Sequence, residues 1–215
     1  MGNKKTSTKQ NTLKLTVCAI MVALATVLSF VKVFDMPYGG SITLFSMVPI
    51  MFAGFAFGPK AGLLTGVVYG AIQCIIGASN SLAYLTESIF LFVVCLLFDY
   101  IIAFSVLGLS GAFKKSVKNP QLSFGLGVLV AGLLRYVCHF VSGWIVWGEY
   151  AQDTVSGWGS LGEKILTTFN GQALAVVYSL VYNASYMIPE IIVSVIGAII
   201  LASVKPIRKE LYKNN

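Results

Sequence analysis

Six apolar runs separated by short polar segments dominate this sequence, and they limit the folds open to it more than any other feature. The runs cover approximately residues 15–33, 43–57, 61–78, 88–109, 122–147 and 173–204. A helix needs about 20 apolar residues to cross the hydrocarbon core of a bilayer, and only the second run is clearly short. Only 11% of the 215 residues are charged, less than half of the roughly 25% typical of soluble domains. We therefore predict an all-α integral membrane protein with six transmembrane helices.

The basic residues lie in blocks beside these runs, and their distribution predicts the topology. If the runs cross the membrane in alternation, 12 of the 15 Lys and Arg residues lie on one side together with both termini, whereas only Lys32 and Lys164 lie on the other. Lys and Arg are enriched in cytoplasmic segments, so we expect both termini in the cytoplasm. Charge in such blocks indicates topology and not nucleic-acid binding. The expected organisation is a polar cytoplasmic tail (1–14), a membrane domain (15–204) and a basic cytoplasmic tail (205–215).

The sequence carries no recognisable signal for catalysis or metal binding. It has a single His and neither an HExxH nor a GxSxG motif, which argues against proteolysis and hydrolysis. The four Cys residues lie within apolar runs without CxxC spacing, so we interpret them as packing residues. The segment at residues 148–172 is rich in Gly and aromatic residues, a composition that suits a lid over the outer end of the bundle. We expect no catalytic residues and no metal site.

Ionisable side chains are rare within the apolar runs, and those present are the first candidates for a binding site. They are Asp99, Arg135, His139 and Glu190. Such residues are costly in hydrocarbon and usually face the interior of a bundle. With a rise of about 1.5 Å per residue, Asp99, His139 and Asn183 lie roughly 12 to 16 Å from the outer ends of three different runs. Polar groups from three helices at one depth indicate a small-molecule pocket.

The fifth run carries a stripe of polar, small and aromatic residues at a spacing of four. Its members are Arg135, His139, Gly143 and Trp147. Residues four apart share one face of a helix, so the stripe either lines a pocket or packs against another helix. The periodicity alone favours neither interpretation. The matching depth of Asp99 and Asn183 favours the pocket.

Arg135 has two candidate partners within the membrane. It can neutralise Asp99 in a purely structural pair, or it can pair with Glu190 and leave Asp99 available to a cationic ligand. The sequence leaves both pairings open. Because Glu190 lies about seven residues beyond Asn183 and therefore deeper, we favour Arg135 and Glu190 as the structural charge pair.

Three ordered motifs resemble those of the thiamine-specific S-components of energy-coupling-factor (ECF) vitamin transporters. The first is Leu97-Phe98-Asp99-Tyr100. The second is LRYVCHF (134–140), followed by Ser142-Gly143 and by WGEYA (147–151). The third is YSLVYN (178–183), followed by Ser185-Tyr186-Met187 and Pro189-Glu190. The resemblance covers nearly the whole chain, and the motifs follow one another at the family's spacing.

This resemblance implies a six-helix subunit that binds thiamine with high affinity from outside a bacterial plasma membrane. Such a subunit is not an enzyme and needs no cofactor, since thiamine is its substrate. Its expected partners are a transmembrane coupling subunit and two cytoplasmic ATPases. In that family an Ala-x-x-x-Ala face of the first helix docks the coupling subunit, and Ala19 and Ala23 match it here. Small residues at this spacing permit close approach of helices.

The resemblance also assigns a substrate-binding set, which comprises Asp99, Tyr100, His139, Gly143, Trp147, Tyr178 and Asn183. The chemistry suits thiamine, because a carboxylate can neutralise its thiazolium cation and an indole can face that cation. A member of the family has a glutamate where Asp99 stands and a tryptophan where this chain reads Tyr38-Gly39-Gly40-Ser41. Tyr38 or Tyr84 is therefore the expected outer or lid contact.

Two alternatives remain open from the sequence. The same architecture can serve another vitamin or a thiamine precursor. A membrane enzyme can use Asp99 and His139 as base and acid, although no nucleophile or metal site accompanies them.

Overall fold

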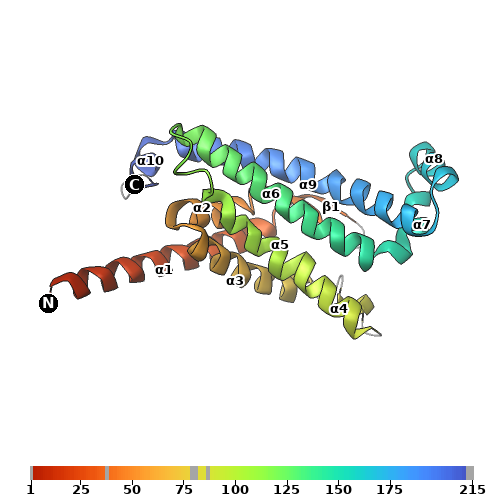
Figure 1. The fold of residues 1–215 in the computed structure, drawn as a ribbon, viewed down its shortest axis with the longest axis horizontal. Helices are drawn as coiled ribbons and strands as arrows, with labels where there is room; N and C mark the ends of the chain where they lie inside the picture. The colour runs from red at the N-terminus through yellow and green to blue at the C-terminus, as the bar shows by residue number, and fades with distance from the viewer. Residues whose placement is uncertain (1, 37–38, 78–81, 86–87, 212–215) are drawn as a thin grey trace.

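The computed structural model describes residues 2–36, 39–77, 82–85 and 88–211, and it is a helical bundle with a single small β-hairpin in the described part (Figure 1). Five helices are long and apolar enough to cross a membrane. They comprise residues Gln10–Ser29 of α1 (Gly2–Ser29), α3 (Pro59–Gly77), the helical segment Ile89–Gly111, α6 (Pro120–Ile145) and α9 (Gly171–Ser203). The predicted helical class and five of the predicted apolar spans are confirmed.

The second predicted run differs from the expectation, because only its last part is helical. Helix α2 (Val48–Phe57) has ten residues, too few to cross the hydrocarbon core at about 1.5 Å per residue. The first run is also shorter than predicted, since α1 ends at Ser29. Between the two helices the chain forms an antiparallel hairpin of β1 (Lys32–Asp35) and β2 (Ser41–Thr43). The two strands have four and three residues and lie mostly between the first two apolar runs. They are too short for the alternation that identifies a strand in a sequence.

The predicted N-terminal tail and the predicted outer loop both contain helices. Helix α1 already begins at Gly2, so the polar segment at residues 2–14 continues the helix, which projects from the bundle in Figure 1. The predicted outer loop folds into η4 (Gly148–Tyr150), α7 (Ala151–Ser156) and α8 (Ser160–Thr168). These three lie at the end of the bundle opposite both termini (Figure 1).

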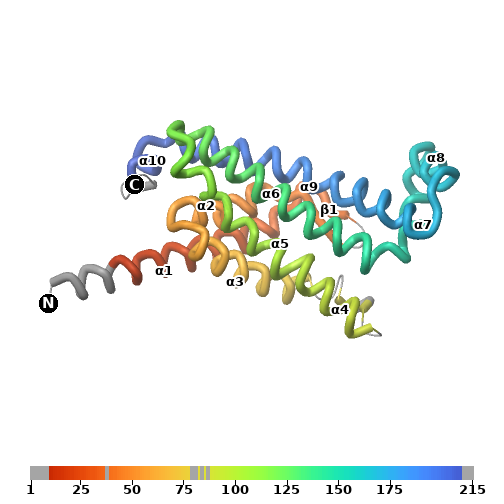
Figure 2. The backbone as a smooth tube through the Cα atoms, in the orientation of Figure 1, coloured from red at the N-terminus to blue at the C-terminus, as the bar shows by residue number. Residues whose placement is uncertain are grey.

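The segment Ile89–Gly111 changes its helical type along its length. It consists of α4 (Ile89–Cys95), the π-helix η2 (Leu96–Ile101), α5 (Ile102–Ser105) and the 3₁₀-helix η3 (Val106–Gly111). Ser88 caps its start by accepting the Leu91 N–H through its hydroxyl. A π-helical turn widens the helix locally and occurs frequently at functional sites. Figure 2 shows the whole segment crossing the bundle beneath α6.

Glycines set how closely η3 approaches its neighbours. A Cβ on Gly108 would collide with the backbone of Gly62 in α3, and a Cβ on Gly54 in α2 would collide with Gly108. Backbone therefore packs on backbone where these three elements cross, as small residues allow in membrane bundles. Beside this crossing, α6 and α9 lie side by side along most of their length (Figure 1). The α6–α9 pair forms a second layer, and the cavity described below opens between the two layers.

We expect Gly127→Ala in α6 to destabilise the bundle, because the added Cβ would overlap the Ser110 carbonyl of η3. Overpacking of this kind costs about 1–3 kcal/mol, which outweighs the gain of up to about 1 kcal/mol from the better helix propensity of Ala. The measurement is the thermal unfolding midpoint of the purified protein in detergent.

Gly125→Ala is the matched control, since Gly125 is buried on the same helix and an added Cβ would make ordinary contacts with the side chains of Ile199, at 3.5 Å, and Val195, at 4.0 Å. It should unfold at or above the temperature of the parent. An equal loss of stability in both variants would contradict the proposed close crossing.

Candidate functional site

A cavity of about 250 Å³ lies between the β-hairpin, α3, η2, α6 and α9. All seven residues of the predicted substrate-binding set line it, together with Arg135 and Glu190. The remaining lining includes Thr43, Ser46, Tyr69, Gln73, Tyr182 and Tyr186. Side chains that lie far apart in the sequence therefore surround one space.

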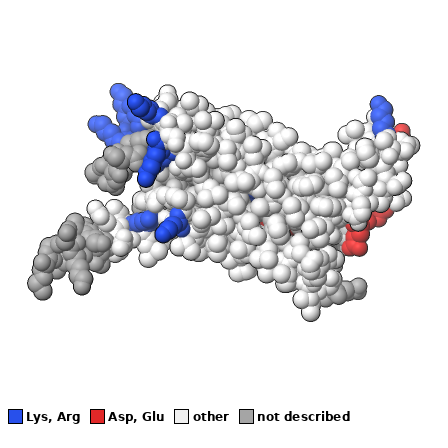
Figure 3. Space-filling view, in the orientation of Figure 1, with Lys and Arg blue, Asp and Glu red and all other residues white. Residues whose placement is uncertain are grey.

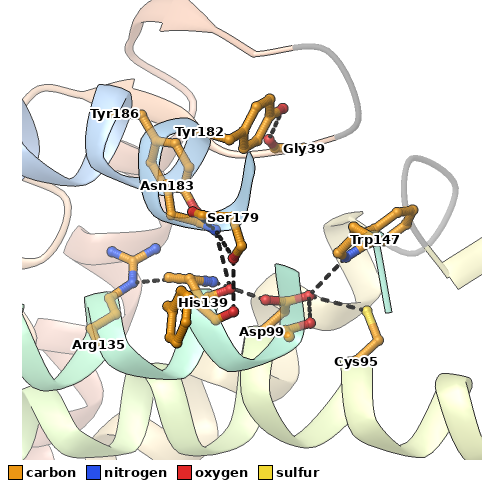
Figure 4. A network of polar contacts seen from close by, with 12 residues as sticks. Gly39, Cys95, Asp99, Arg135, His139, Trp147, Ser179, Tyr182, Asn183 and Tyr186 are labelled. Carbon is orange, nitrogen blue, oxygen red and sulfur yellow. Dashed lines mark hydrogen bonds and ion pairs between the residues drawn. The ribbon is translucent and has the colours of Figure 1, made fainter. Parts of the chain in front are cut away.

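Asp99 is the centre of a network of donors at this cavity (Figure 4). The ring of His139 lies with Nδ1 at 2.9 Å from Oδ1. The other carboxylate oxygen, Oδ2, accepts hydrogen bonds from Ser142 Oγ at 2.6 Å, Trp147 Nε1 at 3.3 Å and Cys95 Sγ at 3.3 Å. The carboxylate side chain is 18% exposed. Burial of a charge in an apolar bundle requires such donors.

The π-helix η2 and the face of α6 position these groups. Cys95 lies four residues before Asp99 on the same segment, and His139 and Ser142 share the inner face of α6. Trp147 follows the end of α6 and precedes η4. Sequence reasoning identified His139 and Trp147 but missed Ser142 and Cys95. The signal for Ser142 was its position three residues after His139, which places both on one helix face.

His139 also bonds on its second ring nitrogen, to Arg135. The Arg135 Nε–H donates to His139 Nε2 at 3.1 Å, and the guanidinium lies over the Phe104 ring at 4.3 Å from its centroid. Arg135, His139 and Asp99 thus form a continuous chain of polar contacts from the inner part of the cavity towards Trp147.

The predicted pairing of Arg135 with Glu190 is not present as an ion pair in the structure, although both side chains line the cavity. Glu190 Oε1 instead accepts hydrogen bonds from the backbone N–H and the hydroxyl of Thr43. Each predicted partner contacts a different group instead. Glu190 contacts Thr43 of β2, an element that the apolar pattern did not reveal. Arg135 contacts His139, one helical turn further along α6.

Asn183 joins α9 to α6. Its side-chain nitrogen donates to the His139 carbonyl at 3.2 Å and to the Ser179 carbonyl at 2.9 Å, and its side-chain oxygen accepts from Tyr186 at 2.7 Å. A Cβ on Gly143 would collide with Ser179 and Asn183. Gly143 is therefore needed for close packing of the two helices beside the cavity.

Aromatic rings from α9 form one wall of the cavity. Tyr178 and Tyr182 have ring centroids 5.5 Å apart, and Tyr182 and Tyr186 have centroids 6.2 Å apart. Trp158 stacks on Tyr178 from the outer segment, at 6.2 Å. Tyr182 and Tyr186 were missed as site residues, although their spacing of four from Tyr178 places all three on one face.

The two tyrosines expected at the outer opening of the site cannot be placed by their side chains. Tyr38 lies outside the described residues, and Tyr84 is described only through its backbone in the 3₁₀-helix η1 (Leu82–Leu85). The neighbouring Gly39 is described, and its carbonyl accepts a hydrogen bond from the Tyr182 hydroxyl at 3.0 Å. This bond joins the hairpin to the aromatic wall.

Ala19 and Ala23 lie away from the cavity, on the exposed face of α1. Val22 and Ala25 form the buried face of the same helix. Within the described part of the chain, no group of three or more His, Cys, Asp or Glu side chains is arranged to hold a metal ion.

Comparison with known proteins gives one consistent assignment. Residues 15–160 match the family model described as thiamine transporter protein (Thia_YuaJ). The thiamine transporter ThiT of Bacillus subtilis (strain 168) is 35% identical, over 87% of this chain and 89% of its own. ThiT of Lacticaseibacillus paracasei is 25% identical, over 74% of this chain and 66% of its own.

A solved structure agrees with this assignment. That of ThiT from Listeria monocytogenes superposes with a TM-score of 0.68 at 26% identity, and the match covers 94% of this chain and 98% of that one. The predicted resemblance to thiamine-specific transport subunits is thereby confirmed at the level of the family. The protein is a member of the thiamine transporter family.

Proposed function

We propose that the chain is the thiamine-binding subunit of an ECF-type vitamin transporter and that the cavity around Asp99 receives the vitamin. The observation that carries this proposal is a carboxylate within an apolar bundle, held by four donors and bordering a cavity with aromatic walls. An anion in such surroundings fits an organic cation. Thiamine carries a permanent positive charge on its thiazolium ring.

The charge of the ligand decides which residue is its main partner. A permanent cation that leaves water loses its hydration, and an ionised partner offsets that cost. Asp99 supplies the negative charge, and the Trp147 indole beside it can attract the same cation through its ring face. We assign the thiazolium to the part of the cavity that borders both Asp99 and Trp147, from which the hydroxyethyl tail can reach Tyr100.

The aminopyrimidine ring of thiamine needs both donors and acceptors. The Asn183 side-chain oxygen accepts one bond, from Tyr186, and an amide oxygen has two lone pairs, so it can accept a second bond from the ligand amino group. The rings of Tyr178 and Tyr182 provide an apolar wall beside it. We assign the aminopyrimidine to this face of α9.

The proposed topology has six crossings and places both termini in the cytoplasm. The second crossing combines α2 with the non-helical residues 41–47 before it, because α2 alone is too short. The distribution of charge supports it: Lys and Arg side chains gather at the end of the molecule that carries both termini, and acidic side chains gather at the other end (Figure 3). Lys and Arg are enriched on the cytoplasmic side. The cavity would then be loaded from the outside, past the hairpin and the α7–α8 segment.

We further propose that α1 docks a transmembrane coupling subunit, which in turn associates with two cytoplasmic ATPases. The exposed Ala19 and Ala23 support this role, because small residues on an outward face let a partner helix approach closely. A membrane enzyme using Asp99 and His139 is not supported, since the family is one of transporters.

We expect Asp99→Asn to weaken thiamine binding by roughly 2–5 kcal/mol, the range for truncating one member of a buried charge pair. The amide removes the negative charge and places an N–H₂ group against donors such as Ser142 and Trp147. The measurement is isothermal titration of the purified variant in detergent with thiamine.

Glu190→Gln is the matched control for Asp99→Asn. The Gln oxygen can still accept the two hydrogen bonds from Thr43, so affinity should change little while stability falls. If Asp99→Asn binds thiamine like the parent and Glu190→Gln does not, Glu190 and not Asp99 is the partner of the thiazolium, and the proposal is wrong.

We expect replacement of Ala19 or Ala23 by Leu to abolish ATP-driven thiamine uptake in cells and to leave binding by the isolated subunit intact. Ala19 and Ala23 are exposed on α1, and neither of them lines the cavity. Uptake of labelled thiamine and titration of the purified variant measure the two properties separately. Loss of both together would show that these alanines pack within the bundle.

A further inference from the structure

The hydrogen bond between Arg135 and His139 determines where the imidazole carries its proton. A guanidinium has only donors, so the Nε2 atom that receives the Arg135 Nε–H must present its lone pair. The single ring proton then lies on Nδ1, and it points at Asp99 Oδ1 at 2.9 Å. In this arrangement His139 is neutral and donates to the carboxylate (Figure 4).

We propose that Arg135 is a positioning residue for ligand binding, which acts through His139 by occupying the nitrogen that would otherwise take a second proton. This inference rests on the proposed function, in which Asp99 neutralises a cationic ligand. A doubly protonated His139 would place a positive charge beside the same carboxylate and compete with the thiazolium. Arg135 thus keeps the charge of Asp99 available to the ligand.

The packing around Arg135 supports a fixed orientation of its side chain. The guanidinium rests on the Phe104 ring, and arginine stacks on aromatic faces in a well-defined plane. Arg135 and His139 are four residues apart on α6, a spacing that brings their side chains together on one helix face. The donor therefore reaches Nε2 without help from another element.

The other charged groups near His139 do not compete for Nε2 in the described part of the chain. Asp99 occupies the opposite side of the ring, and Tyr186 of α9 meets the ring edge-on at 6.0 Å, with its hydroxyl donated to Asn183. Of the remaining charged residues that line the cavity, Lys32 pairs with Asp35 and Glu190 accepts from Thr43. Arg135 is the group that controls this nitrogen.

The test is the pH dependence of thiamine affinity in Arg135→Met, which keeps an unbranched stem but has no donor. Without the Arg135 donor, Nε2 is open to a second proton as the pH falls, so affinity should fall between about pH 8 and about pH 6. The loss should reach up to about 4-fold, the decrease in the neutral fraction of an ordinary histidine over this range. The parent should show no such loss. Titration of the ligand itself is common to all variants and cancels in the ratio to the parent.

Two control variants isolate the mechanism. Arg208→Met makes the same substitution in α10 (Lys205–Leu211), outside the cavity, and should follow the parent. The double variant Arg135→Met with His139→Asn has no imidazole, while the Asn amide can still donate to Asp99. It should therefore lose the additional pH dependence. If Arg135→Met weakens binding equally at both pH values, or not at all, the proposal is overturned.

A measurement on the parent protein covers the case in which Arg135→Met fails to fold. The chain contains one His, so ¹⁵N labelling of histidine reports on His139 alone. In the ligand-free parent at about pH 6, we expect a protonated Nδ1 and an unprotonated Nε2; a proton on both nitrogens would refute the proposal. Absence of thiamine binding by the parent at either pH would instead refute the proposed function.

Discussion

A carboxylate inside an apolar bundle has to be satisfied by donors, and the arrangement of the central helices depends on how Asp99 meets that requirement. Its donors come from one turn earlier on its own segment, from two positions on α6 and from Trp147 just after α6. These contacts fix the rotation of α6 about its axis, because His139 and Ser142 must both face the carboxylate. The same rotation turns Gly143 towards α9 and lets Asn183 reach the His139 carbonyl. The geometry of the cavity thus follows from one buried charge.

The predictable part of this structure is the part recorded in local composition. Apolar runs predicted six transmembrane helices, and five of them are long enough in the structure to cross a membrane. The rarity of ionisable residues in those runs singled out Asp99 and His139. The stripe on α6 gave the correct face. These features depend on residues within a single helix, so a single sequence contains the whole signal.

The features that were missed depend on contacts between segments. Thr43 was taken as the first residue of an apolar run, but it ends a two-stranded hairpin, where it donates to Glu190 in place of the expected partner Arg135. The outer segment was taken as a loop because its glycines conceal the short helices α7 and α8. Ser142 and Tyr186 carry no charge in the membrane, and only the position of Asp99 and Asn183 gives them a role.

The glycine crossing of α2, α3 and η3 has a mechanical consequence. A contact between two backbones involves no side chains that could change rotamer. These elements therefore cannot slide past one another in small steps. The crossing at Gly54, Gly62 and Gly108 is therefore expected to move as one rigid unit. Any widening of the cavity that admits or releases a ligand has to be taken up on the opposite side, where α6, α9 and the hairpin meet through side chains and single hydrogen bonds such as that from Tyr182 to Gly39.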